Sequence, residues 1–235
     1  MNIKKITFCQ NENWIYDKLP RRLDSDYNPL YEFQYPFSKT IALDCERIVY
    51  KLIENNISSD ICRNLNIVFI NENQLNKTEL TDFIAFNQKD MRFVNTYVNS
   101  NNFNILSDEQ KRKNIFDKIY EALILVSESD KANHIKQICN DVFLSSDETE
   151  CIFLTKTLKK YTISVKFRSS FNGYTAILYI NNNITLQQER TVLFENRSFA
   201  DLEYRIHKII IKKNQCIIHP KNNETDVPII VNMDI

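Results

Sequence analysis

The chain contains a single glycine, Gly173, in 235 residues, where an average composition would give roughly 16. Glycine permits positive φ angles and a close approach of the backbone to phosphate groups. The nucleotide sites that can be read from a sequence depend on it. The one glycine follows Asn172, and an Asn-Gly pair between apolar runs is typical of a β-hairpin turn. We therefore expect a hairpin at Gly173 and none of the glycine-rich phosphate loops.

The residue usage and the charge are typical of a soluble globular protein. The chain is rich in Asn, Ile and Lys, a residue usage typical of a gene with AT-rich DNA. Such a gene would also encode few glycines, which is a second explanation of their shortage. Thirty basic side chains balance thirty acidic ones, so no overall field draws the chain to nucleic acid or acidic lipid. The apolar run Ala122–Val126 is far shorter than the roughly 20 residues of a membrane span. We expect no membrane and no nucleic acid as partner.

Six cysteines are distributed along the chain without a Cys-X-X-Cys pair. Their wide spacings match no disulfide or zinc framework. Four of them fall at apolar positions of predicted helices or strands: Cys45, Cys139, Cys151 and Cys216. Buried thiols that act as small hydrophobic side chains are expected. Together with an N-terminal apolar run too short for a signal peptide, they predict a reducing cytoplasm.

Helical and strand patterns alternate over residues 1–146. Ser38 can cap a helix in which apolar residues recur at helical spacing from Ile41 to Ile53. A second helix is predicted from the capping box of Ser107 and Gln110. A third helix follows the acidic turn at 127–130 and would form a hairpin with the second. Short strands are expected at 4–9, 65–70, 83–86 and 92–98.

The pattern changes to strands from residue 147 onward. Three apolar residues alternate with three polar ones, namely Ile163, Val165 and Phe167 with Ser164, Lys166 and Arg168. This alternation predicts a half-buried strand. Four antiparallel strands are expected at 150–156, 161–167, 174–180 and 184–194, then a helix over 198–213 and edge strands at 215–219 and 227–231.

The predicted fold class is therefore α+β. A mixed N-terminal region with a helical hairpin (1–146) packs on a C-terminal antiparallel meander sheet with a covering helix (147–235). The two parts form either two domains or one continuous core.

No local motif has the spacing of a metal site. Cys216 and His219 carry ligand atoms three residues apart, but such residues point to opposite faces of a strand. Asp24, Asp26 and Asn28 resemble the start of a calcium loop that lacks its glycine and its glutamate. We therefore predict neither a metal nor a cofactor.

No catalytic signature is found either. The carboxylates that could pair in space are not selected by any spacing: Glu109, Asp147, Glu148, Glu150, Glu189 and Glu203. A hydrolase or nuclease assembled from such residues stays open as the alternative, and it would show a concave pocket with perturbed pKa values.

An aromatic stretch between residues 14 and 37, interrupted by three prolines, is the one feature that points to a partner. Tyrosine and arginine dominate the energetics of protein interfaces. We predict partner contacts by Arg21, Arg22, Tyr27, Tyr31, Phe33 and Tyr35. The alternative is a long loop folded onto its own core.

These features favour a non-catalytic intracellular binding protein. The form that suits them best is a bacterial inhibitor or immunity-type protein that neutralises a toxin by occluding its active site. A nucleic-acid-binding protein would need its scattered lysines to converge on one face. The identity of the partner and the oligomeric state do not follow from the sequence.

Overall fold

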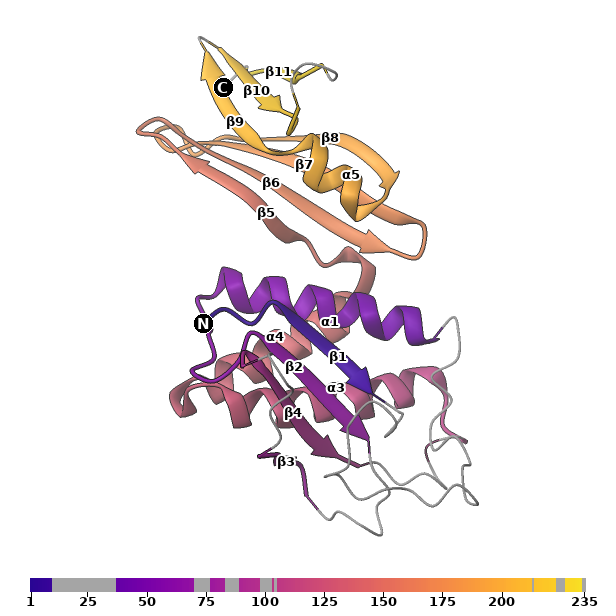
Figure 1. Cartoon of the computed structure of the whole chain (residues 1–235). Helices are drawn as coiled ribbons and strands as arrows, with labels where there is room; N and C mark the ends of the chain where they lie inside the picture. Colours follow the sequence, from indigo (N-terminus) through magenta and orange to yellow (C-terminus); the bar gives the residue numbers. More distant parts are fainter. Residues whose placement is uncertain are drawn as a thin grey trace. The chain divides into compact units, whose positions relative to one another are not determined.

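The computed structural model spans the whole chain and describes residues 1–9, 37–69, 77–82, 89–97, 103, 105–212, 214–222 and 227–233 (Figure 1). The chain divides into two compact units, Met1–Ser146 (unit 1) and Asp147–Ile235 (unit 2). Both units combine helices with strands, so the α+β class expected from the sequence is confirmed. Whether the units are independent domains stays a prediction.

Unit 1 is built on a mixed sheet with the strand order β1-β2-β4-β3. β1 (Lys5–Cys9), β2 (Asn64–Phe69) and β4 (Met91–Thr96) are parallel, and the short β3 (Glu79–Leu80) runs antiparallel to β4. Parallel neighbours need a crossover connection, and α1 (Phe37–Glu54) lies between β1 and β2 in the chain.

Two further helices complete unit 1, α3 (Asp108–Val126) and α4 (Ala132–Ser145), which pack against each other as the expected helical hairpin. α3 begins at the predicted capping box, in which Ser107 Oγ accepts the backbone N–H of Gln110. One-turn 3₁₀ helices, Ser129–Lys131 and Ser146–Glu148, stand before and after α4. Apolar side chains of sheet and helices share one core, including Ile6, Leu65, Ile67, Val94, Ile48, Leu52, Ile119, Leu123 and Ile138.

Unit 2 contains the expected antiparallel meander. β5 (Cys151–Thr157), β6 (Tyr161–Ser170), β7 (Gly173–Asn182) and β8 (Gln188–Arg197) pair in chain order. Ser170 is the register partner of Gly173, so the hairpin loop is Phe171-Asn172, one residue earlier than an Asn-Gly loop. Gly173 itself has a φ of 128°, which side chains with a Cβ disfavour.

The short helix α5 (Phe199–Arg205) covers one face of the meander (Figure 1). Its Phe199 ring lies 5.2 Å from the ring of Tyr174 and 6.1 Å from that of Phe167, centroid to centroid. Phe153 completes this aromatic cluster from β5. The apolar side of the meander is therefore the side that α5 covers.

The helix expected over 198–213 is wrong in its second half. α5 ends at Arg205, and the chain forms a second antiparallel sheet from β9 (Lys208–Lys212), β10 (Gln215–His219) and β11 (Ile229–Asn232). Three consecutive isoleucines, Ile209–Ile211, occupy β9. Branched side chains favour strands, and a short apolar run fits either periodicity until tertiary pairing decides.

Five cysteines have described side chains, and all five are buried thiols as expected: Cys45, Cys62, Cys139, Cys151 and Cys216. Burial raises the pKa of Cys139 to about 12 and that of Cys216 to about 11. No helix in the described part of the chain combines the length and the apolar character that a bilayer span requires.

Candidate functional site

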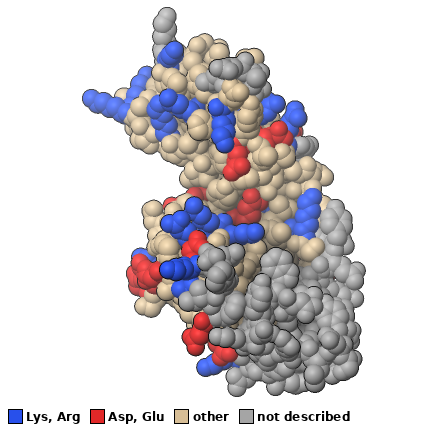
Figure 2. Space-filling model, viewed as in Figure 1, with Lys and Arg blue, Asp and Glu red and all other residues tan. Residues whose placement is uncertain are grey.

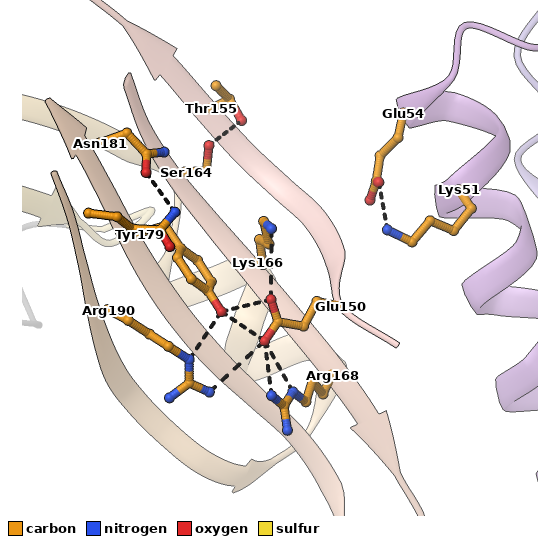
Figure 3. Close-up of polar contacts among 11 residues, drawn as sticks. Lys51, Glu54, Glu150, Thr155, Ser164, Lys166, Arg168, Tyr179, Asn181 and Arg190 are labelled. Atoms are coloured by element: carbon orange, nitrogen blue, oxygen red, sulfur yellow. Dashed lines mark hydrogen bonds and ion pairs between the residues drawn. The ribbon is translucent and has the colours of Figure 1, made fainter. Parts of the chain in front are cut away.

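Five polar side chains meet on the face of the β5–β8 sheet opposite the aromatic cluster (Figure 3). We call them the Glu150 cluster: Glu150, Lys166, Arg168, Tyr179 and Arg190. Lys166 and Arg168 lie two residues apart on β6 and share a face. Tyr179 on β7 is the register partner of Ser164 and of Arg190, which brings it to the same face. Glu150 directly precedes β5.

The carboxylate of Glu150 is the centre of the cluster. Arg168 donates to its Oε1 from Nη2 at 3.0 Å and from Nε at 3.3 Å. The hydroxyl of Tyr179 lies 2.8 Å from Oε2 and 2.9 Å from Oε1. Lys166 Nζ approaches Oε2 to 3.7 Å, and Arg190 Nη2 approaches Oε1 to 4.0 Å. Three strands, β6, β7 and β8, are thus tied to one side chain, which itself precedes the fourth strand, β5.

Tyr179 links the carboxylate to the remaining cations. Its hydroxyl accepts a hydrogen bond of 3.0 Å from Arg190 Nε while it donates to Glu150. Lys166 Nζ lies 4.6 Å from the centroid of the Tyr179 ring, a cation–π contact. Arg168 also pairs with Glu148. Three cations therefore face two carboxylates, and the side chains around Tyr179 hold one another in place.

The contacts decide which protonation state Glu150 adopts. Burial alone would raise the pKa of the carboxyl, but hydrogen bonds from Tyr179 and Arg168 and the charges of Lys166 and Arg168 outweigh it, so the pKa lies below its usual value. Burial and the bond to Glu150 raise the pKa of Tyr179. Glu150 is therefore an anion and Tyr179 a neutral donor at neutral pH.

Sequence reasoning found part of this cluster. The alternation in β6 had placed Lys166 and Arg168 on one polar face, and Glu148 and Glu150 were among the candidate carboxylates. Tyr179 and Arg190 were missed. The hairpin is the signal that could have revealed Tyr179. Pairing outward from its turn places Tyr179 opposite Ser164, which lies on the same face of β6 as Lys166.

The predicted partner-contact residues lie outside the described residues: Arg21, Arg22, Tyr27, Tyr31, Phe33 and Tyr35. The contacts expected from them stay a prediction.

Lys111, Arg112 and Lys113 form a basic run in the sequence, and two of these side chains are turned inward. Lys111 is buried, with Nζ 6.0 Å from the ring centroid of Phe103. Arg112 binds the buried Asp44 with bonds of 2.7 and 2.9 Å. On the face drawn in Figure 2, basic side chains are spread over both units with acidic ones between them.

The possible metal-ligand pair Cys216 and His219 is also separated by the structure. Cys216 is buried on β10, and His219, three residues on, points to the other face of that strand. Within the part of the chain that the structure describes, no three histidine, cysteine or acidic side chains gather as a metal site.

In comparisons with known proteins, no protein-family model, no curated protein and no solved structure matches this chain.

Proposed function

We propose that this chain is a non-catalytic binding protein that recognises a protein partner through the sheet face bearing the Glu150 cluster. The observation that carries the proposal is the convergence of Arg168, Tyr179 and Arg190 around one carboxylate. Arginine and tyrosine are the residue types most enriched among the few side chains that dominate interface energetics. Here the two arginines remain accessible, and Glu150 and the buried Tyr179 hold them in position before a partner arrives, which lowers the entropy lost on binding.

The protonation chemistry of the cluster suits recognition better than proton transfer. A general acid or base works best with a pKa near the working pH, whereas the contacts of Glu150 move its pKa away from neutrality. We assign Glu150 the role of orienting the cations around it. Lys166, Arg168 and Arg190 outnumber the carboxylates of Glu150 and Glu148 by one positive charge, which favours a partner surface of acidic character.

Among proteins that act by binding alone, we favour an inhibitor or immunity-type protein. Such a protein acts by occlusion: it covers the active site of a bacterial toxin and needs only affinity. The segment that contains Tyr31 and Tyr35 would then add contacts to those of the Glu150 cluster.

The test is affinity capture from the native cell with the full chain, followed by titration of the recovered partner. Replacing two cluster cations, Arg168→Ala with Arg190→Ala, should weaken the dissociation constant about 10-fold or more. The matched control is Arg205→Ala, which removes an exposed arginine from α5 and should leave affinity unchanged. A chain that enriches no protein, or a cluster variant with wild-type affinity, would overturn the proposal.

A further inference from the structure

One end of the β5–β8 sheet is formed by two adjoining turns, which we call the tip: Leu158–Lys160 between β5 and β6, and Asn183–Gln187 between β7 and β8. The backbone N–H of Asn183 donates to the carbonyl of Lys160 at 2.8 Å. Its side-chain amide donates to the carbonyl of Leu158 at 3.1 Å. The two turns therefore behave as a single body.

The longer turn is locked from inside by Asn182, whose side chain is only 2% exposed. Asn182 Oδ1 accepts the backbone N–H groups of Ile184 at 2.9 Å and Thr185 at 3.1 Å. Its carbonyl accepts the N–H of Leu186 at 2.9 Å. These bonds correct the sequence-based expectation that β8 starts at residue 184: the N–H groups that a strand would use are taken by Asn182, and β8 begins at Gln188.

The backbone conformation of Leu186 in this turn is unfavourable for a leucine. Its φ is 60°, in the left-handed region that glycine and asparagine tolerate and other residues avoid. Asn56, at a φ of 54° after α1, shows the usual choice. Burial does not compensate Leu186, because its side chain is 85% exposed, and its neighbour Ile184 is 70% exposed. The hydrogen bonds of Asn182 hold the backbone of residue 186 in this conformation, but they would do the same for an asparagine there. The choice of an exposed leucine therefore points to a function outside the fold.

The tip is also positively charged. Lys159 and Lys160 are exposed on the shorter turn, and neither 157–161 nor 182–188 contains an acidic residue. On a chain with no net charge, the tip combines two aliphatic side chains with two local positive charges.

We propose that the tip inserts Ile184 and Leu186 into an apolar pocket of the protein partner, with carboxylates at the pocket rim pairing with Lys159 and Lys160. This docking mode rests on the proposed function. It adds the tip, as a second contact on the same sheet, to the contact made by the Glu150 cluster. A convex turn needs a concave partner, and its hydrogen bonds fix the bound conformation in advance. A protein pocket is favoured over an anionic membrane because two lysines and two aliphatic side chains fall short of the paired signals that stable lipid anchoring takes.

The experiment uses the full chain in its native cell, with a photoreactive phenylalanine derivative in place of Ile184, of Arg190 or of Leu144. Leu144 lies on α4 and is 79% exposed, so it controls for exposure alone. A protein adduct from position 184, and none from 144, is expected.

Affinity for the cross-linked partner is then measured for Leu186→Asn and Leu144→Asn. Asparagine tolerates the φ of residue 186, so a weaker complex cannot be attributed to misfolding of the turn. We expect Leu186→Asn to weaken binding about 10-fold or more and Leu144→Asn to leave it unchanged. Lys159→Ser with Lys160→Ser should weaken binding less and reduce its salt dependence.

Each other outcome counts against the inference in its own way. Adducts at 190 but not at 184, or an unchanged affinity of Leu186→Asn, would overturn the tip contact and leave the proposed function standing. No protein adduct from any position would overturn both. Binding of the chain to phosphatidylserine vesicles, lost in Leu186→Asn, would replace the protein pocket by a lipid surface.

Discussion

The Tyr179 hydroxyl lies within hydrogen-bond distance of both carboxylate oxygens of Glu150, at 2.8 and 2.9 Å. The two residues are 29 positions apart in the chain. One precedes an edge strand and the other lies in the middle of an inner strand of the same sheet. The bond joins the start of the meander to its centre and sets where Arg168, Lys166 and Arg190 are held (Figure 3).

Removing the hydroxyl should destabilise unit 2 without changing its core. In Tyr179→Phe, Glu150 loses a neutral donor, and a hydrogen bond to a charged group of this kind contributes about 1.5–3 kcal/mol. The exposed Arg190 loses its acceptor as well. We expect the free energy of unfolding in urea to fall by about 1–3 kcal/mol. Tyr120→Phe is the control, because the Tyr120 hydroxyl makes no hydrogen bond to the described residues; an equal loss in both variants would contradict the assignment.

The lowered pKa of Glu150 predicts an acid-sensitive contribution to stability. Because the folded-state pKa lies below the usual value, the contribution is complete above the usual glutamate pKa and is lost as the pH falls through the folded pKa. The stability difference between wild type and Glu150→Gln should therefore be largest near pH 7 and shrink towards about pH 3. Urea unfolding at both pH values measures it, and a difference independent of pH would argue against an ionised Glu150.

The hairpin turn depends on Gly173. With a φ of 128°, a β-branched residue at this position should cost about 1–3 kcal/mol of unfolding free energy. Gly173→Val tests this by thermal or urea unfolding. Thr175→Val, also on β7 but without a positive φ, serves as the matched control; comparable stability of the two variants would place the strain elsewhere.

Substitution of a buried charge in unit 1 should lower the free energy of unfolding far more than substitution of a surface hydrogen-bonding pair. Asp44 is fully buried and binds Arg47 at 2.8 Å and Arg112 at 2.7 Å. Asp44→Asn leaves two guanidinium groups without their carboxylate, and breaking a buried pair in this way costs about 3–5 kcal/mol. Unfolding of this variant is compared with Gln137→Ala, which removes an exposed bond to Asp141 on α4 and should cost no more than about 0.5 kcal/mol. Similar losses would mean that the Asp44 network contributes little.

Much of the local structure could be predicted, because its causes lie within a few residues. The capping box of Ser107 and Gln110 starts α3, and the alternation from Ile163 to Arg168 forms β6 with its polar face. Where the local signal was ambiguous, prediction failed: Ile209–Ile211 suit a helix or a strand, and pairing with β10 decided for the strand. Ile184 continued an apolar pattern, yet the side chain of Asn182 captured its N–H.

By itself the sequence determined the α+β class and which side chains share a face, since a period of two or 3.6 residues depends only on near neighbours. Only the tertiary structure decided which charges meet. Arg112 belongs to a basic run, but its carboxylate partner is 68 positions away, and Glu150 finds Arg168 and Tyr179 through strand register. Such pairings follow from how the chain closes its loops and aligns its strands, and no short stretch of residues encodes them.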